Sequence, residues 1–256
     1  MSGDSKTLSM AVVDGIAKQK LHVILIVDTS RSMAGKRIGQ VNAAISDIRD
    51  YLVELQSENS NVDFYMSIMT FSNNAEFLSG YKCVNVNQML PPTLKAGGYS
   101  NLHCAYQKLT PELQRESRGG MMPDFGGIAP IILLITDGHP TKSSEAQLKE
   151  LRALPWFRAS LRYGIAIELN DARTMRVLTD FTEDKDCVID CVDSNTLAKI
   201  IQVIVLTASR VKSQSSAVRI NRSPKGARGI VKQNNAHIVV KQQVKVTLDE
   251  IDDWEW

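Results

Sequence analysis

The stretch that decides the fold is Leu21-His22-Val23-Ile24-Leu25-Ile26-Val27, an almost continuous apolar run that stops at Asp28. Runs of this length with no polar alternation are typical of central strands that are buried on both faces of a parallel sheet. A second run of the same kind covers residues 131–135 and is followed by Thr136 and Asp137. The two runs predict two buried strands, each of which ends in a carboxylate.

Helical patterns separate the predicted strands. Apolar residues recur every three or four positions from Ile38 to Leu52, which predicts one face of a long helix over about 35–56. The remaining patterns predict strands at 62–72, 161–169 and 186–191, an antiparallel edge strand within 75–82, and helices at 101–114, 145–153, 171–181 and 194–211. Strands that alternate with helices imply right-handed crossovers. We therefore predict an α/β fold, Rossmann-like and doubly wound, with a mostly parallel central sheet flanked by helices and one antiparallel edge strand.

Composition excludes several classes of protein. The chain has 256 residues, 43% of them hydrophobic and 23% charged, which are globular proportions. The four cysteines are too few and too scattered for a disulfide scaffold, and no apolar run is long enough for a membrane span. We expect a soluble, cytoplasmic protein with reduced thiols and no contact with membranes.

Charge is distributed unevenly along the chain, although the net charge is only +2. Residues 210–245 contain nine basic residues and no acidic one, and residues 249–256 contain five acidic residues and two tryptophans. We predict an N-terminal extension over 1–19, one domain over 20–210, and a basic linker or strand segment over 211–256 that ends in the acidic tail. The basic segment makes binding of nucleic acid or another acidic partner an alternative function.

Oxygen-bearing side chains follow the predicted strands at one edge of the sheet. Asp28, Ser30 and Ser32 follow the first strand, Ser100 follows the pair Gly97-Gly98, and Asp137 follows the strand at 131–135. Ligands of open α/β sheets bind at the carboxyl ends of the strands. Two carboxylates and three hydroxyls suit Mg²⁺ or Mn²⁺, which prefer oxygen ligands. Two carboxylates roughly neutralise such an ion, so that it can accept a further carboxylate from outside.

These segments resemble a known family. Asp28-Thr29-Ser30-Arg31-Ser32-Met33, Gly97-Gly98-Tyr99-Ser100-Asn101 and Thr136-Asp137-Gly138 are similar to the metal-ion-dependent adhesion site of von Willebrand factor A (vWA) domains. The resemblance covers about residues 20–210. It implies that Asp28, Ser30, Ser32, Ser100 and Asp137 hold the metal, and that a protein partner supplies an Asp or Glu as a further ligand.

Within that family, the pattern Asp-Thr-Ser-x-Ser-Met-x-Gly and the pattern Thr-Asp-Gly-x-Pro-Thr are most similar to bacterial tellurium-resistance-type cytoplasmic members. Such members often accompany a Ser/Thr kinase and a PP2C-type phosphatase in sets associated with stress response or phage defence. The resemblance therefore implies a partner of one of these two kinds.

Three residues near the predicted site are candidates for contact with a partner. Arg31 stands where the family usually has a small residue, and it could weaken metal binding or pair with a partner's carboxylate. Tyr99 lies between Gly98 and Ser100, and Ser100 stands where the family usually has Thr. His139 directly follows the third segment, Thr136-Asp137-Gly138. We predict partner binding by Arg31, Tyr99 and His139.

Catalysis is the weaker alternative. A strand that ends in Asp28 could begin a Mg²⁺-dependent phosphatase-like enzyme, with Asp28 as the covalent nucleophile. Phosphatases of that type carry a second Asp two residues later, where this chain has Ser30. We predict that the chain is not an enzyme, has no catalytic residue, and needs no cofactor other than the metal. The acidic tail at 249–256 could cap the metal site or bind the basic segment.

Overall fold

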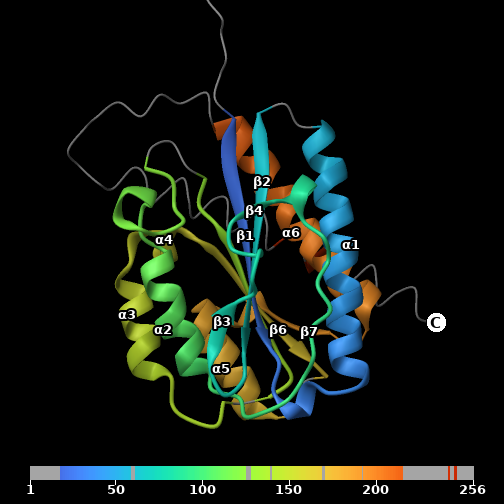
Figure 1. Cartoon of the computed structure of the whole chain (residues 1–256), viewed down its shortest axis with the longest axis vertical. Coiled ribbons are helices and arrows are strands. Elements are labelled where there is room, and N and C mark those ends of the chain that lie inside the picture. The colour runs from blue at the N-terminus through green and yellow to red at the C-terminus, as the bar shows by residue number, and fades with distance from the viewer. Residues whose placement is uncertain are drawn as a thin grey trace, which may run out of the picture.

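A central sheet with helices on both faces forms the body of the chain (Figure 1). The computed structural model describes residues 18–58, 61–124, 128–138, 140–168, 171–191 and 193–215, together with the isolated residues 242, 245 and 246. The side chains of residues 194, 195 and 207–215 are outside this description. The predicted α/β fold with a mostly parallel sheet is confirmed.

The sheet within the described residues has seven strands in the order β3-β2-β1-β5-β6-β7, and β4 also pairs with β2. Their bounds are β1 Gln19–Asp28, β2 Val62–Phe71, β3 Ala75–Phe77, β4 Val84–Asn85, β5 Ile131–Thr136, β6 Leu161–Ile167 and β7 Val188–Cys191. All pairings are parallel except those of β3 and β4, which run antiparallel to β2. The antiparallel edge expected within 75–82 is therefore present, as the short strand β3.

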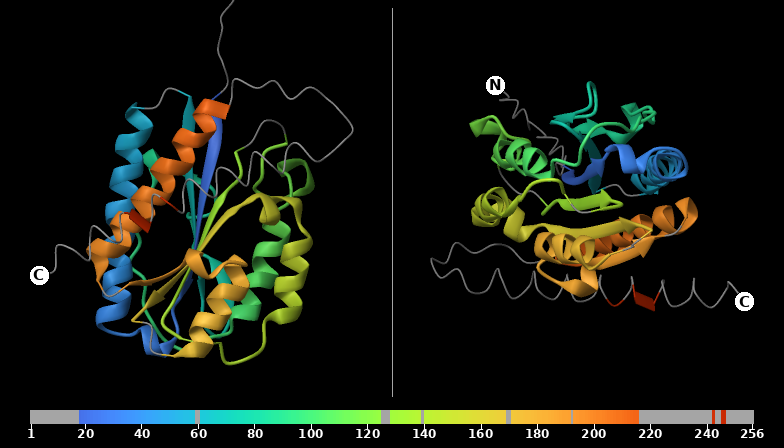
Figure 2. Two further views of the ribbon diagram at one scale, coloured as in Figure 1. Left: turned by 180° about the vertical axis from the view of Figure 1, so that it is seen from behind. Right: turned by 90° about the horizontal axis from the view of Figure 1, so that it is seen from below.

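The helices form two layers, one on each face of the sheet (Figure 2). The helices are α1 Lys36–Glu58 and α6 Ser194–Ser215 on one face, and α2 Leu102–Glu112, α3 Glu145–Ala153, α4 Pro155–Ala159 and α5 Ala172–Thr182 on the other. Short 3-10 turns are η1 Arg31–Met33, η2 Val86–Gln88, η3 Glu116–Arg118 and η4 Lys185–Cys187. Pro155 cannot continue α3, and it opens α4, because its fixed φ suits the first helical position.

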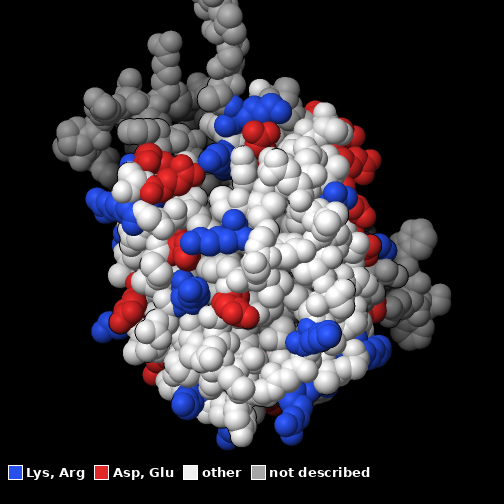
Figure 3. Space-filling view, in the orientation of Figure 1, with Lys and Arg blue, Asp and Glu red and all other residues white. Residues whose placement is uncertain are grey.

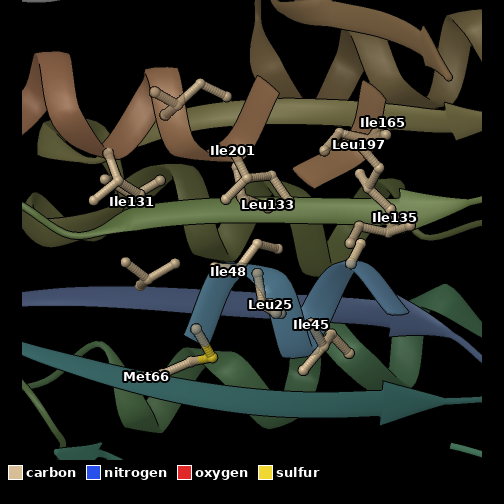
Figure 4. Close-up of a cluster of buried hydrophobic side chains, with 14 of the residues drawn as sticks. Leu25, Ile45, Ile48, Met66, Ile131, Leu133, Ile135, Ile165, Leu197 and Ile201 are labelled. Carbon is tan, nitrogen blue, oxygen red and sulfur yellow. The ribbon is translucent and has the colours of Figure 1, made fainter. Parts of the chain in front are cut away.

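The core explains why the first apolar run shows no alternation. Leu21, Val23 and Leu25 of β1 pack toward α1 and α6, whereas Ile24 and Ile26 pack toward the opposite helices. All five side chains are fully buried, so both faces of β1 require apolar residues. Figure 4 shows the first of these layers, in which side chains of α1 and α6 lie over β1, β2, β5 and β6; its labelled residues include Leu25, Ile45, Ile48, Met66, Leu133, Ile165, Leu197 and Ile201.

Strand order places the ends of β1, β2 and β5 at one edge of the sheet. β1 lies between the other two, with Asp28 beside Phe71 and Val27 beside Ile135. The next residues along β1 and β5, Asp28 and Thr136, therefore lie close together. The turn η1 and the start of α1 lie at this same edge, at the bottom of Figure 1. None of the described helices combines the length and the apolar character that crossing a membrane would require.

Candidate metal centre

Asp28 is the buried centre of the predicted site. It is the last residue of β1, and its side chain is fully buried. Oδ1 accepts a hydrogen bond of 2.8 Å from the backbone N–H of Ser30. Oδ2 accepts hydrogen bonds from the hydroxyls of Ser100 at 2.9 Å and Thr136 at 2.7 Å. Burial raises the pKa of Asp28, although these three hydrogen bonds favour the charged form and oppose the rise.

Asp28 has no basic partner among the residues that the structure describes. A buried carboxylate is costly unless a cation or several donors compensate its charge. Here three donors hold the carboxylate, and no positive charge does. A divalent ion beside these oxygens would supply the missing charge.

The first loop links Asp28 to Asp137 through two serines. The hydroxyls of Ser30 and Ser32 are 3.1 Å apart, and the Ser32 hydroxyl donates to Oδ1 of Asp137 at 2.8 Å. Met33 fixes this loop, because its side chain is fully buried and its N–H donates to the carbonyl of Ser30 at 3.1 Å. Ser32 is exposed whereas Ser30 and Asp28 are buried, so the cluster is open to solvent from one side.

The second loop carries Ser100 and is braced against two neighbouring turns. Gly97 donates its N–H to the carbonyl of Thr29 at 2.7 Å, and Arg31 donates its N–H to the carbonyl of Gly98 at 3.0 Å. The side chain of Asn73 accepts the N–H of Tyr99 at 2.9 Å. Gly98 has a φ of +88°, which favours glycine, and an added Cβ would lie 2.9 Å from Oδ1 of Asn73. This geometry turns the Ser100 hydroxyl toward Asp28 and leaves Tyr99 69% exposed.

The structure therefore brings together all five predicted metal-site residues, Asp28, Ser30, Ser32, Ser100 and Asp137. Of the predicted partner-binding residues, Arg31 and Tyr99 are exposed beside this cluster. His139 lies outside the described residues. The basic segment 210–245 and the acidic tail also lie outside them, apart from the backbone of 210–215 and the isolated residues 242 and 245.

Sequence reasoning missed three residues of this edge. Thr136 supplies the shortest hydrogen bond to Asp28. Arg37, in the first turn of α1, donates to Oδ2 of Asp137 at 2.6 Å and to Oε2 of Glu168 at 2.9 Å. Those contacts raise the pKa of the Arg37 guanidinium, and the hydrogen bond to Glu168 is the largest cause. Glu168 directly follows β6, which ends at Ile167, whereas the predicted strand over 161–169 extends past Glu168 and so conceals this strand end.

The donor set suits a hard divalent ion. Within the described part of the chain, no group of three or more His, Cys, Asp and Glu is placed to hold a metal. An ion in this cluster would therefore depend on serine hydroxyls together with the two aspartates. Oxygen atoms alone, with no thiolate or imidazole, are the ligands that Mg²⁺ and Mn²⁺ prefer.

Comparison with known proteins places this arrangement in a family. A family model described as von Willebrand factor type A domain matches residues 22–203. No curated protein matches the sequence.

Several solved structures share the fold. A pilus adhesin, SpaC, from Lactobacillus rhamnosus GG superimposes with a TM-score of 0.54 and 13% identity, over 76% of this chain and 31% of the adhesin. Proximal thread matrix protein 1 from the mussel byssus superimposes with a TM-score of 0.51 and 16% identity, over 75% of this chain and 48% of the byssus protein. The ArnB paralogue VWA2 from Sulfolobus acidocaldarius gives 0.50 and 21% identity, over 72% and 45%. This chain thus spans less than half the length of each, and at these identities the likeness concerns the fold alone.

Proposed function

The chain belongs to the von Willebrand factor type A domain family, and on that premise we propose that it is a divalent-metal-dependent protein-binding module. One observation carries the proposal. Three donors from separate segments converge on Asp28, a buried carboxylate without a basic partner among the described residues: the backbone N–H of Ser30 and the hydroxyls of Ser100 and Thr136. A divalent cation beside these oxygens would compensate the charge of the carboxylate.

The residues that would hold the ion are Asp28, Ser30, Ser32, Ser100 and Asp137. The ion would be Mg²⁺ or Mn²⁺, because every donor is a hard oxygen. When bound, it supplies an electrophilic position that an acidic side chain of a partner can occupy. The chain's own part is to orient the hydroxyls and to keep Asp28 charged within the sheet.

The surface around the cluster suits an acidic partner. The exposed Arg31 lies between Ser30 and Ser32 in the first loop. The exposed Tyr99 directly precedes Ser100 in the second loop. Tyrosine and arginine are the residue types that most often dominate protein interfaces. The Arg31 guanidinium can pair with the carboxylate that the partner presents.

Binding, rather than catalysis, is the activity we propose. Phosphatases of the haloacid-dehalogenase type use a second Asp, two residues after the nucleophile, as acid and base, and this chain has Ser30 at that position. The hydroxyl of Ser30 is instead 3.1 Å from that of Ser32, within the cluster.

The cellular setting is proposed from sequence motifs alone. The two motifs around Asp28 and Asp137 resemble those of bacterial tellurium-resistance-type cytoplasmic proteins. We propose a cytoplasmic role in a stress-response or defence set, with a Ser/Thr kinase or a PP2C-type phosphatase as the partner. Binding of nucleic acid through residues 210–245 is the alternative, and the nine basic residues there favour it. On the face in Figure 3, by contrast, basic and acidic side chains are interspersed rather than segregated.

The test is capture of partner proteins by the full chain, in Mg²⁺ and in chelator, with wild type and Asp28→Ala. We expect capture only by wild type and only in Mg²⁺. Asp63→Ala is the control, because Asp63 lies near the start of β2, at the other end of the strands, and forms an ion pair with the exposed Lys18 at 3.4 Å. Equal capture by Asp28→Ala, or capture that survives the chelator, would show that binding does not use this cluster. Binding of DNA or RNA that weakens steeply with salt and disappears on removal of residues 211–256 would favour the alternative.

A further inference from the structure

Arg37 lies between the candidate metal centre and Glu168, and all of its polar nitrogens are engaged. Nη1 donates to Oδ2 of Asp137 at 2.6 Å and to the carbonyl of Ser32 at 3.2 Å. Nε donates to Oε2 of Glu168 at 2.9 Å, and Nη2 lies 2.8 Å from the same oxygen. One guanidinium thus joins two carboxylates at the edge of the sheet.

The start of α1 is an unfavourable position for a cation, and the two carboxylates compensate for this. Arg37 is the second residue of α1, and the N-terminal end of a helix repels positive charge. Glu168 has a φ of +57°, which is uncommon for a residue with a side chain, and its N–H donates to the carbonyl of Cys191 at 3.2 Å. The fold therefore maintains an acidic residue beside Arg37 at some conformational cost.

Asp137 is the point of competition between Arg37 and a metal ion. Its side chain is 1% exposed, and each carboxylate oxygen has a partner: Ser32 on Oδ1 and Arg37 on Oδ2. A divalent ion held by Ser32 and Asp137 would lie next to the positively charged guanidinium. Because like charges repel strongly in a partly buried site, the ion and Arg37 cannot both gain fully from the charge of Asp137.

We infer that Arg37 is an internal counter-cation that sets the affinity of this centre for its divalent ion. Arg37 neutralises Asp137 when the ion is absent, and Glu168 retains the guanidinium when the ion takes over Asp137. The carboxylates of Asp28, Asp137 and Glu168 carry three negative charges at this edge, and the guanidinium of Arg37 carries one positive charge. The two remaining negative charges are neutralised by one divalent ion. The inference rests on the proposed function and adds the residue that regulates its metal.

The two partners of the pair should then act in opposite directions. Arg37→Gln removes the competing charge and should raise affinity for Mg²⁺ and Mn²⁺ about tenfold, a change typical of residues just outside a metal's ligands. Glu168→Gln leaves the guanidinium on Asp137 alone and should lower affinity by a similar factor. Arg37→Lys keeps the charge but loses the fork that spans both carboxylates, so its affinity for metal should lie between those of wild type and Arg37→Gln.

The experiment is calorimetric titration of the full chain with Mg²⁺ and with Mn²⁺, supported by thermal unfolding in chelator and in metal. Arg49→Gln is the matched control, because Arg49 lies on the same helix, is 24% exposed against 25% for Arg37, and pairs with Asp50. Arg37→Gln should also unfold at a lower temperature than wild type in chelator, since Asp137 then loses its cation. Addition of metal should raise the unfolding temperature of the variant by more than it raises that of wild type.

The outcomes separate this inference from the proposed function. Metal binding by wild type that is unchanged or weaker in Arg37→Gln overturns the inference and leaves the proposed function intact. Metal binding by Arg37→Gln but not by wild type supports the inference and overturns metal-dependent binding by the native chain. Metal binding by neither protein, with both folded, overturns both.

Discussion

The hydroxyl of Thr136 donates a 2.7 Å hydrogen bond to Oδ2 of Asp28, and this contact joins the ends of the neighbouring strands β5 and β1. The bond is charge-assisted and buried, which makes it stronger than a bond between neutral groups. It holds the carboxylate in place at the centre of the candidate metal site. Thr136 itself need not contact the ion.

Thr136→Val tests this contact because it keeps the shape of the side chain and removes the hydroxyl. We expect the free energy of unfolding to fall by about 1–2 kcal/mol, since Asp28 loses one of three donors. Chemical denaturation in chelator measures the change. Thr110→Val is the control, because the Thr110 hydroxyl donates only to the carbonyl of Tyr106 in its own helix, and its loss should change little. Equal effects at the two positions would contradict a special role for Thr136.

Gly98→Ala should disturb the loop that carries Ser100. The φ of +88° is strained for alanine, and the new Cβ would lie 2.9 Å from Oδ1 of Asn73. We expect a loss of at least about 1 kcal/mol in the free energy of unfolding, together with weaker metal binding. Gly97→Ala is the matched control, because an added Cβ there meets nothing within 4 Å. If both variants behave as wild type, the Asn73 brace does not determine the position of Ser100.

The fold and the clustering of Asp28, Ser30, Ser32 and Asp137 are predicted from the sequence for the same physical reason, whereas Ser100 is predicted from the Gly97-Gly98 loop and from the resemblance to vWA domains. Apolar runs such as the one ending at Asp28 reveal buried parallel strands, and strand ends reveal the edge at which ligands bind. The pairing of Arg37 with Asp137 could not be predicted, because the two residues are 100 positions apart and Arg37 fits equally well on the polar face of a surface helix. Side-chain contacts of this kind depend on the exact placement of α1 over the sheet.

The other departures are local. The short helix α4 is absent from the predicted elements; it directly follows α3, because Pro155 favours the first position of a new helix. The predicted domain boundaries at 19 and 210, and the roles of the basic segment and acidic tail, stay predictions.

The burial of His22 predicts that the free energy of unfolding depends on pH in a way that does not involve the metal site. The ring is 5% exposed, Nε2 lies 2.8 Å from the hydroxyl of Ser67, and burial lowers its pKa from 6.5 to about 3, with Lys20 adding repulsion. The folded protein therefore binds this proton less readily than the unfolded chain does. The stabilisation is complete above pH 6.5 and is lost as the pH falls toward 3.

The free energy of unfolding should drop by about 2 kcal/mol between about pH 7 and about pH 5 through this residue alone. His22→Gln should flatten the profile over that range, because the amide can still bond to Ser67 but does not titrate. A wild-type slope in His22→Gln would assign the pH dependence to other groups.

Asp28→Asn separates the charge of the central carboxylate from its shape. Without metal, we expect the variant to be as stable as wild type or more stable, because the buried and unpaired charge is removed while the hydroxyls of Ser100 and Thr136 can still form hydrogen bonds. With Mg²⁺ at roughly a hundred times its dissociation constant, wild type should gain about 2.7 kcal/mol in the free energy of unfolding. The variant should gain none.

Asp63→Asn, which removes a carboxylate from an exposed pair with Lys18, should gain as much as wild type. A Mg²⁺-dependent gain in Asp28→Asn that equals that of wild type would mean that the charge of Asp28 is not needed to hold the ion, and would contradict its place at the centre of this cluster.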